Sequence, residues 1–143
     1  MSEPVIVKER SKDQEGGKYT QDVMTSRHHL TADEPESFGR ADLGPTPFEY
    51  LCAALRACTT ITMRMYIERK GWAVDHLACE VSHTNTTIGD LPPKDVFTRA
   101  ITIKGDIDEA ARKRILVIAG KCPVHKTLHA SSNIETHLAE DAV

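Results

Sequence analysis

The sequence predicts an α+β fold with a largely antiparallel sheet and one long helix, and three observations support this prediction. Helical periodicity with start and stop signals runs through residues 47–70. Alternating apolar and polar residues follow at 72–87 and 96–104, with a turn-rich connection between them. Strands and helices are grouped along the chain rather than strictly alternating, which favours an antiparallel sheet over a doubly wound parallel one. At a length of 143 residues, we expect a single domain over residues 1–143.

The long helix is expected to run from Pro47 to Lys70. Thr46 suits the N-cap, Pro47 suits the first helical position, and Glu49 stands three residues after the cap, which is the capping-box spacing. Lys70 places a cation in the last turn, and Gly71 tolerates the left-handed dihedral angles of a helix terminus.

One face of this helix carries a stripe that we expect to be buried, with residues at alternating steps of four and three: Leu51, Leu55, Cys58, Thr62 and Met65. A helix of about 25 residues spans roughly 37 Å. That is longer than a compact core of this size needs. A homodimer that shares the long helix would bury its full length.

Short strands are expected before the helix. Residues 5–7 are one candidate, the two glycines within 14–18 favour a hairpin turn, and residues 19–30 continue as one or two strands. Residues 31–44 are acidic and rich in glycine and proline, so we expect a loop that leads into the helix.

After the helix, the strand over 96–104 is expected to pair back on the strand over 72–87. The elements expected beyond them are a helix over 109–119 capped by Asp108, a shorter helix from Cys122 to about Ala130, and a last strand over 131–137 with Ile134 as its apolar residue.

Charge and hydropathy exclude several classes of partner. The formal net charge of -3 and the pI near 6.1 give no electrostatic case for binding nucleic acid or an anionic membrane. No run approaches the roughly 18 apolar residues of a membrane span, and the first ten residues lack the apolar core and cleavage site of a signal peptide. We therefore expect a cytoplasmic protein without nucleic-acid or membrane partners.

The four cysteines are Cys52, Cys58, Cys79 and Cys122. They form no Cys-x-x-Cys pair, which argues against a structural zinc site or a thioredoxin-type motif. In a reducing compartment they should be thiols, although transient, catalytic disulfides stay open as an alternative. We interpret Cys52 and Cys79 as packing residues.

Cys122 and Cys58 differ in their expected electrostatics. Cys122 precedes Pro123 at the expected N-cap of a helix, whose partial positive charge favours a thiolate. Lys121 adjoins it, and His125 follows one turn on. Cys58 lies mid-helix among apolar neighbours, which raise a thiol pKa unless a cation or a hydrogen-bond donor reaches the sulfur. On these grounds alone, two alternatives to a functional thiol stay open: Cys122 as a helix-capping residue, and Cys58 as a buried core residue.

The histidines include the pair His28 and His29, and His125 and His129 at helical i, i+4 spacing. No glutamate follows His125 as in the zinc-protease motif. We therefore expect no metal site and no cofactor.

Two segments together resemble the family of osmotically inducible protein C and the organic hydroperoxide resistance proteins. The first is Gly44-Pro-Thr-Pro-Phe-Glu-Tyr-Leu-Cys-Ala-Ala-Leu-Arg-Ala-Cys58, similar to the family's Asn-Pro-Glu-(Glu/Gln)-Leu…Ala-Ala-Cys stretch. The second is Lys121-Cys-Pro-Val-His-Lys-Thr-Leu128, similar to its Cys-Pro-Val-x-x-Thr-Leu motif. The order of the elements also fits, so the resemblance covers nearly the whole chain. It implies an intertwined α+β homodimer with long central helices and strands contributed by both chains.

The resemblance also implies a chemistry. In peroxidase members of the family, the helix cysteine attacks the peroxide. The second cysteine resolves the resulting sulfenic acid as a disulfide, which a dithiol reductant then resets. Carried over by position, Cys58 corresponds to the peroxidatic residue and Cys122 to the resolving one.

The charged residues of the family's site are carried over in the same way. The family's glutamate position holds Phe48 here, and Glu49, one residue on, is the nearest carboxylate. For the family's N-terminal arginine, alignment on the glycine turn gives Lys18, with Arg27 and Arg40 as alternative cations.

Three hypotheses about function follow. The first is a thiol-dependent peroxidase, acting as a homodimer, that reduces organic hydroperoxides through Cys58 and Cys122 with a dithiol reductant. The second is a non-catalytic module that holds a small apolar ligand in a pocket at the dimer interface, and Phe48 in place of a carboxylate favours it. The third is a redox sensor that signals by oxidation of the same cysteines.

Overall fold

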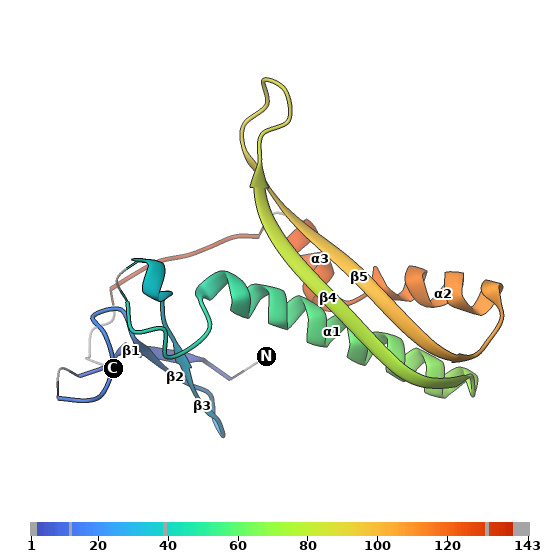
Figure 1. The fold of residues 1–143 in the computed structure, drawn as a ribbon, viewed down its shortest axis with the longest axis horizontal. Coiled ribbons are helices and arrows are strands. Elements are labelled where there is room, and N and C mark those ends of the chain that lie inside the picture. The colour runs from blue at the N-terminus through green and yellow to red at the C-terminus, as the bar shows by residue number, and fades with distance from the viewer. Residues whose placement is uncertain (1–2, 12, 39, 131, 139–143) are drawn as a thin grey trace. The chain divides into compact units, whose positions relative to one another are not determined.

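The structure is a computed structural model that describes residues 3–11, 13–38, 40–130 and 132–138 (Figure 1). Its helices and antiparallel sheets confirm the predicted α+β class. The chain forms two compact units, one of residues 1–50 with 136–143 and the other of residues 51–135. That residues 1–143 form one domain stays a prediction.

The first unit contains a three-stranded antiparallel sheet of β1 (Ile6–Glu9), β2 (Gln21–Met24) and β3 (His29–Ala32), in that order. A turn joins β2 to β3, with the Thr25 N–H donating to the His28 carbonyl oxygen at 2.9 Å. Two strands therefore begin within the predicted region 19–30. The 3-10 helix η1 (Glu36–Phe38) follows the sheet, before the long helix.

The long helix α1 (Pro47–Lys70) begins in the first unit and continues into the second. Its start is the predicted capping box, because the Thr46 N–H donates to the Glu49 carboxylate at 2.7 Å and the Glu49 N–H donates to Thr46 Oγ1 at 3.2 Å. It ends at Gly71, whose φ of 66° is left-handed and costs glycine little. The predicted bounds of the helix are confirmed.

In the second unit, β4 (Ala73–Thr86) and β5 (Lys94–Asp106) form a long antiparallel hairpin. On β5, alternate residues from Phe97 to Ile103 are partly buried, and the residues between them are exposed. This is the period of two expected from the sequence.

One glycine permits the strands to approach closely at the open end of the hairpin. Gly105 pairs with Val74 next to a register shift, and a Cβ on Gly105 would lie 2.2 Å from the Ala73 carbonyl oxygen. Any side chain at this position would force the two strands apart.

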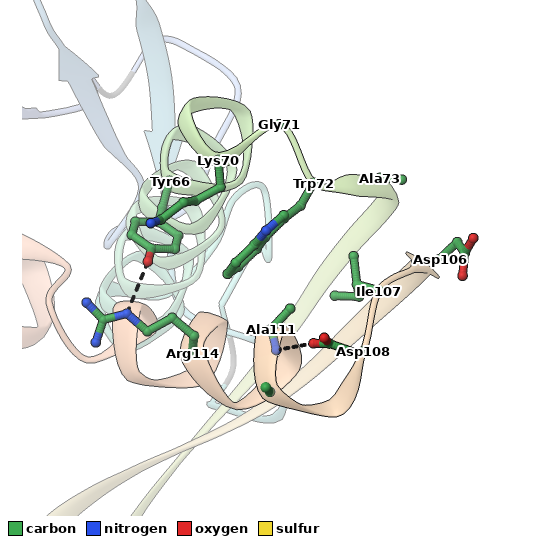
Figure 2. Close-up of a pocket in the computed structure, with 11 residues that line it drawn as sticks. Tyr66, Lys70, Gly71, Trp72, Ala73, Asp106, Ile107, Asp108, Ala111 and Arg114 are labelled. Atoms are coloured by element: carbon green, nitrogen blue, oxygen red, sulfur yellow. Dashed lines mark hydrogen bonds between the residues drawn. The ribbon is translucent and has the colours of Figure 1, made fainter.

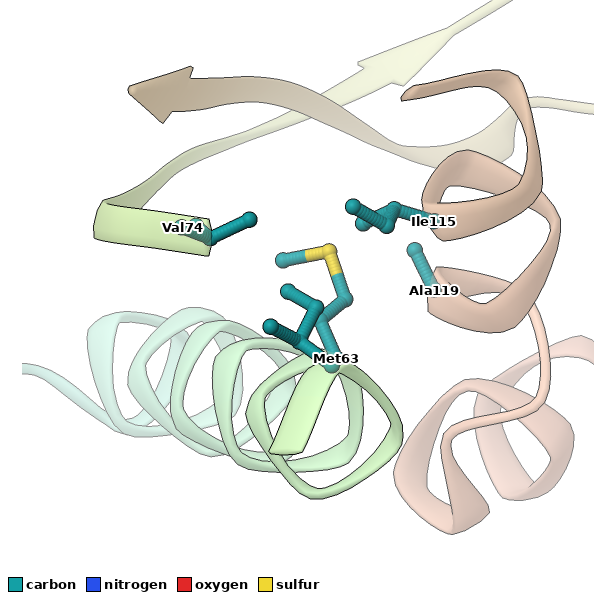
Figure 3. Close-up of a cluster of buried hydrophobic side chains, with 5 residues drawn as sticks. Met63, Val74, Ile115 and Ala119 are labelled. Carbon is teal, nitrogen blue, oxygen red and sulfur yellow. The ribbon is translucent and has the colours of Figure 1, made fainter. Parts of the chain in front are cut away.

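Two further helices, α2 (Glu109–Ala119) and α3 (Pro123–His129), complete the second unit. Asp108 caps α2, as predicted, by accepting a hydrogen bond from the Ala111 N–H at 2.7 Å. The core lies where α1, α2 and β4 meet (Figure 3). Its buried members are Met63, Ile67, Val74, Ile115 and Ala119.

The prediction of a last strand is wrong over residues 132–137, the part of it that the structure describes. Residues 132–137 form no strand, and Ser131 lies outside the described residues. Ile134, the apolar residue of this stretch, is 89% exposed. One apolar side chain among polar neighbours offers no face that could be buried.

The predicted buried stripe of α1 is also partly wrong. Leu51 and Met65 are exposed, and the packed face is offset around the helix from the predicted stripe. The cause is that α1 is apolar on more than one side, and periodicity alone does not say which side the other elements cover. The residues of α1 that are buried are Leu55, Thr59, Met63, Tyr66 and Ile67.

Replacing Met63 by alanine should destabilise the second unit, because Met63 is completely buried in the core. We expect the free energy of unfolding to fall by roughly 2–5 kcal/mol, the range for truncating a buried methionine. The matched control is Ile134→Ala, the truncation of an exposed apolar side chain of the same unit, which should alter it by less than about 0.5 kcal/mol. Urea unfolding of dilute protein, followed by circular dichroism, measures both. Equal losses would contradict this packing.

Candidate two-cysteine site

Cys58 on α1 and Cys122 at the start of α3 come together in the second unit. Their thiol groups are hydrogen-bonded to each other, and both are free thiols. Cys122 is completely buried, whereas Cys58 is partly exposed. The structure therefore brings the two motif cysteines into one site, in which solvent reaches only Cys58.

The first turn of α3 holds the sulfur of Cys122. Cys122 is the N-cap of α3, as predicted, and its Sγ accepts a hydrogen bond from the His125 N–H at 3.5 Å. Pro123 fixes the backbone at the first helical position. The Val124 N–H donates to the same sulfur, and the Cys58 thiol donates to it from α1. Donors from α3 and from α1 thus converge on Cys122.

These contacts move the two thiol pKa values in opposite directions. Burial raises the pKa of Cys58, and the hydrogen bond to Cys122 raises it further. Burial also opposes ionisation of Cys122, but the hydrogen bonds to its sulfur outweigh burial, so the pKa of Cys122 is lowered. The pair therefore favours a Cys122 thiolate that accepts a hydrogen bond from the Cys58 thiol. Both directions agree with those predicted from the sequence.

Arg99 of β5 joins this site to the rest of the second unit. Its Nη1 donates to Thr59 Oγ1 at 3.1 Å and to the Ala119 carbonyl oxygen at 3.0 Å, and its Nη2 lies 2.9 Å from His125 Nδ1. A guanidinium has only donors, so Nδ1 is the acceptor and the neutral ring carries its proton on Nε2. Burial, Arg99 and His129 lower the pKa of His125, which keeps the ring neutral at pH 7.

A cavity of about 410 Å³ adjoins the site, because Arg99 and His125 line it. This volume is within the range of pockets that hold small organic molecules. Most of its remaining lining is apolar or basic and consists of Leu55, Ile88, Val96, Phe97, Leu128, Lys94 and His129, together with Asp95.

The charged residues carried over from the family resemblance lie in the first unit. Glu49 is engaged in the capping box of α1. Lys18 and Arg40 lie over the ring of Tyr19, at 5.6 and 3.7 Å from its centroid. Arg27 lies in the bend between β2 and β3. The catalytic roles expected for them stay predictions.

The other two cysteines occupy different environments. Cys79 on β4 is buried, and burial raises its pKa although Arg99 and Arg56 oppose this. Cys52 is partly buried on α1. That both serve packing stays a prediction.

Arg99 and Thr59 were not predicted from the sequence. One signal pointed to Arg99, since it stands between Phe97 and Ile101 on the inward face of β5, where the alternation calls for an apolar residue. A charged group on such a face needs hydrogen-bond partners. Thr59 gives no comparable signal, because helical threonines commonly bond a backbone carbonyl, as Thr59 does with Leu55 at 2.7 Å.

A second cavity, of about 600 Å³, lies where the end of α1 meets the start of α2 (Figure 2). Tyr66 and Trp72 meet edge to face there, with ring centroids 5.7 Å apart. Arg114 Nε donates to the Tyr66 hydroxyl at 3.1 Å, and this hydrogen bond lowers the pKa of Tyr66. Neither the two cysteines nor Arg99 and His125 line this cavity, so it is separate from the two-cysteine site.

Over residues 3–11, 13–38, 40–130 and 132–138, no group of three or more His, Cys, Asp or Glu side chains is placed to hold a metal ion. His125 and His129 instead stack on each other with ring centroids 5.7 Å apart. None of the helices in the described part of the chain is long and apolar enough to cross a membrane.

The fold and the paired thiols define a class, an α+β protein with a two-cysteine site between a long helix and a short one. Comparison with known families then identifies the family. The model of the OsmC-like protein family matches residues 39–137. This is more than half of the chain, and the protein therefore belongs to the OsmC-like family. No curated protein matches the sequence.

Solved structures share the fold at low identity. An OsmC-like protein from Mycoplasma pneumoniae is 18% identical with a TM-score of 0.71, over 90% of this chain and 88% of that one. An organic hydroperoxide resistance protein from Legionella pneumophila is 14% identical with a TM-score of 0.63, over 87% of this chain and 88% of that one. Another, from Elizabethkingia anophelis, is 15% identical with a TM-score of 0.65, over 88% and 86%. At these identities the likeness shows the fold alone.

Cys122 should ionise at a lower pH than Cys58, because donors surround its sulfur whereas burial and the neighbouring sulfur oppose ionisation of Cys58. As the pH rises, Cys122 should lose its proton first. The ¹³Cβ shifts of labelled cysteines, assigned with single Cys→Ser variants, measure each pKa under reducing conditions. Buried Cys79, whose pKa is raised, is an internal control and should also follow Cys122. Earlier ionisation of Cys58 would contradict this arrangement.

Proposed function

We propose that the protein is a thiol-dependent peroxidase that reduces organic hydroperoxides through a Cys58–Cys122 disulfide. The observation that carries this proposal is the hydrogen-bonded pair of free thiols, one partly exposed and one buried. Cys58 is the more exposed of the two residues, and buried Cys122 is hydrogen-bonded to it. This supports Cys58 as the residue that is oxidised and Cys122 as the one that resolves it.

The first step oxidises Cys58. Its sulfur attacks the terminal peroxide oxygen while its proton passes to the Cys122 thiolate, the O–O bond breaks and an alkoxide leaves. The alkoxide takes the proton from Cys122. The products are an alcohol, a Cys58 sulfenic acid and a regenerated Cys122 thiolate.

The second step forms the disulfide. The Cys122 thiolate attacks the Cys58 sulfur, the S–O bond breaks and hydroxide leaves. A dithiol then reduces the disulfide, is itself oxidised, and returns both thiols. With its lowered pKa, Cys122 is the better leaving thiolate in that reduction. The cycle needs a reducing compartment such as the cytoplasm.

The nature of the substrate is supported by the cavity beside the site. Apolar side chains such as Leu55, Phe97 and Leu128 line much of it, which suits the organic part of a hydroperoxide. Membership of the OsmC-like family also supports the proposal, as do the names of two relatives as organic hydroperoxide resistance proteins. The resemblance adds Glu49, with Lys18 or Arg27, as charged residues for the reaction.

The same cavity favours a second candidate, a module that holds a small apolar ligand without turning it over. A redox sensor would also use the two cysteines but would accumulate the disulfide at slow turnover. Only the peroxidase should consume peroxide continuously when a dithiol reductant is supplied, so this measurement distinguishes it from both other candidates.

We also propose that the protein acts as a homodimer. Ile61 and Met65, one turn apart on α1, are 59% and 67% exposed, and Leu116 and Val117 of α2 are each 52% exposed. Large apolar side chains gathered on a helix face mark interaction surfaces. A second copy of the chain would cover the side of α1 that is turned away from the core of the second unit.

Treating the reduced protein with tert-butyl hydroperoxide should give a Cys58–Cys122 disulfide, detected by peptide mass spectrometry. Cys58→Ser should abolish peroxide consumption. Cys122→Ser should slow sulfenic acid formation by about 100-fold or more, because the proton acceptor is lost. The control Cys52→Ser, on the same helix, should behave as wild type. Persistence of the peroxide with no disulfide and no sulfenic acid would refute the peroxidase.

The homodimer is tested by placing charges on the exposed face of α1. The double variant Ile61→Asp, Met65→Asp should sediment as a monomer, because paired carboxylates would be buried in the interface. Lys8→Asp, at an exposed position on β1, changes the net charge by the same amount and should remain dimeric. Analytical ultracentrifugation measures both. A monomeric wild type at micromolar concentration would rule out the dimer.

A further inference from the structure

A charged side chain that the proposed reaction does not use lies at the centre of the second unit. Arg99 is on the inward face of β5, opposite Val81 of β4. Its hydrogen bonds reach three other elements, at Thr59 of α1, Ala119 of α2 and His125 of α3. Among the described residues, the groups that it hydrogen-bonds are a hydroxyl, a carbonyl oxygen and an imidazole nitrogen, none of them a carboxylate.

We propose that Arg99 is the positioning residue of the two-cysteine site: its donors hold the first turn of α3, whose His125 N–H hydrogen-bonds the Cys122 sulfur, and the buried Thr59 hydroxyl of α1 beside that sulfur. Arg99 acts through these neighbours and not on the sulfur directly. Its effect on the thiol follows from the contacts alone, whereas its effect on turnover rests on the proposed peroxidase function.

The first connection runs through Thr59. Arg99 Nη1 occupies one lone pair of Thr59 Oγ1 at 3.1 Å, so the hydroxyl proton must be directed to another acceptor. Two acceptors are in reach, the Leu55 carbonyl oxygen at 2.7 Å and the Cys122 sulfur. Thr59 is completely buried, so water does not compete for it. Arg99 thereby keeps Thr59 as a donor.

The second connection runs through the segments on either side of Cys122. Arg99 Nη1 holds the Ala119 carbonyl oxygen at 3.0 Å, three residues before Cys122, and Nη2 holds His125 Nδ1 at 2.9 Å, three residues after it. The backbone N–H of that same His125 donates to Cys122 Sγ at 3.5 Å. One guanidinium therefore anchors both flanks of the cysteine.

This geometry requires an arginine. A planar guanidinium donates in several fixed directions, here to acceptors on three elements. A lysine ammonium is a point charge on a flexible stem and cannot hold all three at once. Arg99→Lys therefore keeps the charge and removes the shared anchor.

The titration of Cys122 in the full chain tests the proposal. Cys58 on α1 and Cys79 on β4 are the titratable groups that face it, so the ¹³Cβ shifts of all cysteines are followed together. In Arg99→Lys we expect the pKa of Cys122 to rise by about one unit, with the circular dichroism spectrum unchanged. Disulfide formation with tert-butyl hydroperoxide near neutral pH should slow about tenfold, in step with the smaller thiolate population.

The matched control is Arg64→Lys. Arg64 is also a partly buried arginine of the second unit, but it donates to one backbone carbonyl, that of Val74, at 2.9 Å. This variant should leave the titration of Cys122 unchanged. An unchanged Cys122 pKa in folded Arg99→Lys, or an equal rise in Arg64→Lys, would overturn the proposal.

If Arg99→Lys does not fold, His125→Phe tests the same connection from its other end. His125 is only partly buried on the short helix α3, and the change removes Nδ1 but keeps the backbone N–H. We expect the pKa of Cys122 to rise by about half a unit, and no change would overturn the proposal.

The titration uses no peroxide, so the two proposals fail separately. If the pKa of Cys122 rises in Arg99→Lys but the wild type consumes no peroxide, the peroxidase is refuted and the role of Arg99 stands. If the wild type consumes peroxide but the pKa of Cys122 is unchanged in Arg99→Lys, only the role of Arg99 is refuted.

Discussion

The apolar contact of α1 with α2 and β4, centred on Met63, is the constraint on which the second unit depends. It fixes the rotation of α1 about its axis, so Thr59, one turn before Met63, is completely buried, and Cys58 lies at the edge of the packed face, partly exposed. The same contact places the end of α2 beside α1. The chain that leaves Ala119 therefore begins α3 next to Cys58, and the site is a consequence of how the core packs.

The two sulfur atoms are chemically alike, and their surroundings make them different. Cys122 gains thiolate character from neutral donors, first the Cys58 thiol and then the backbone N–H groups of α3. Cys58 has the more apolar position and keeps its proton more firmly. Such a division suits a pair in which one sulfur accepts a proton and the other is oxidised. A single thiolate placed in the open would lack both the proton acceptor and the resolving partner.

The helix α1 presents more apolar surface than one chain covers. Its 24 residues carry one apolar face that packs against α2 and the hairpin and another, including Ile61 and Met65, that stays exposed. The hydrophobic effect acts on both faces alike. The homodimer proposed above would cover this exposed face.

What the sequence determined by itself was local. The bounds of α1, the alternation along the hairpin, the cap of α2 and the N-cap position of Cys122 all depend on residues within about one turn or one strand of each other. The opposite pKa directions of the two thiols were predictable for the same reason, while the pairing of Cys58 with Cys122 came only from the family resemblance.

Only the tertiary structure decided which face of α1 is buried and what surrounds Arg99. Its partners lie 40, 20 and 26 residues away along the chain. A polar side chain on an inward face indicates that it must have hydrogen-bond partners. The packing of the helices on the sheet decides which groups those partners are, because no local sequence pattern encodes that geometry.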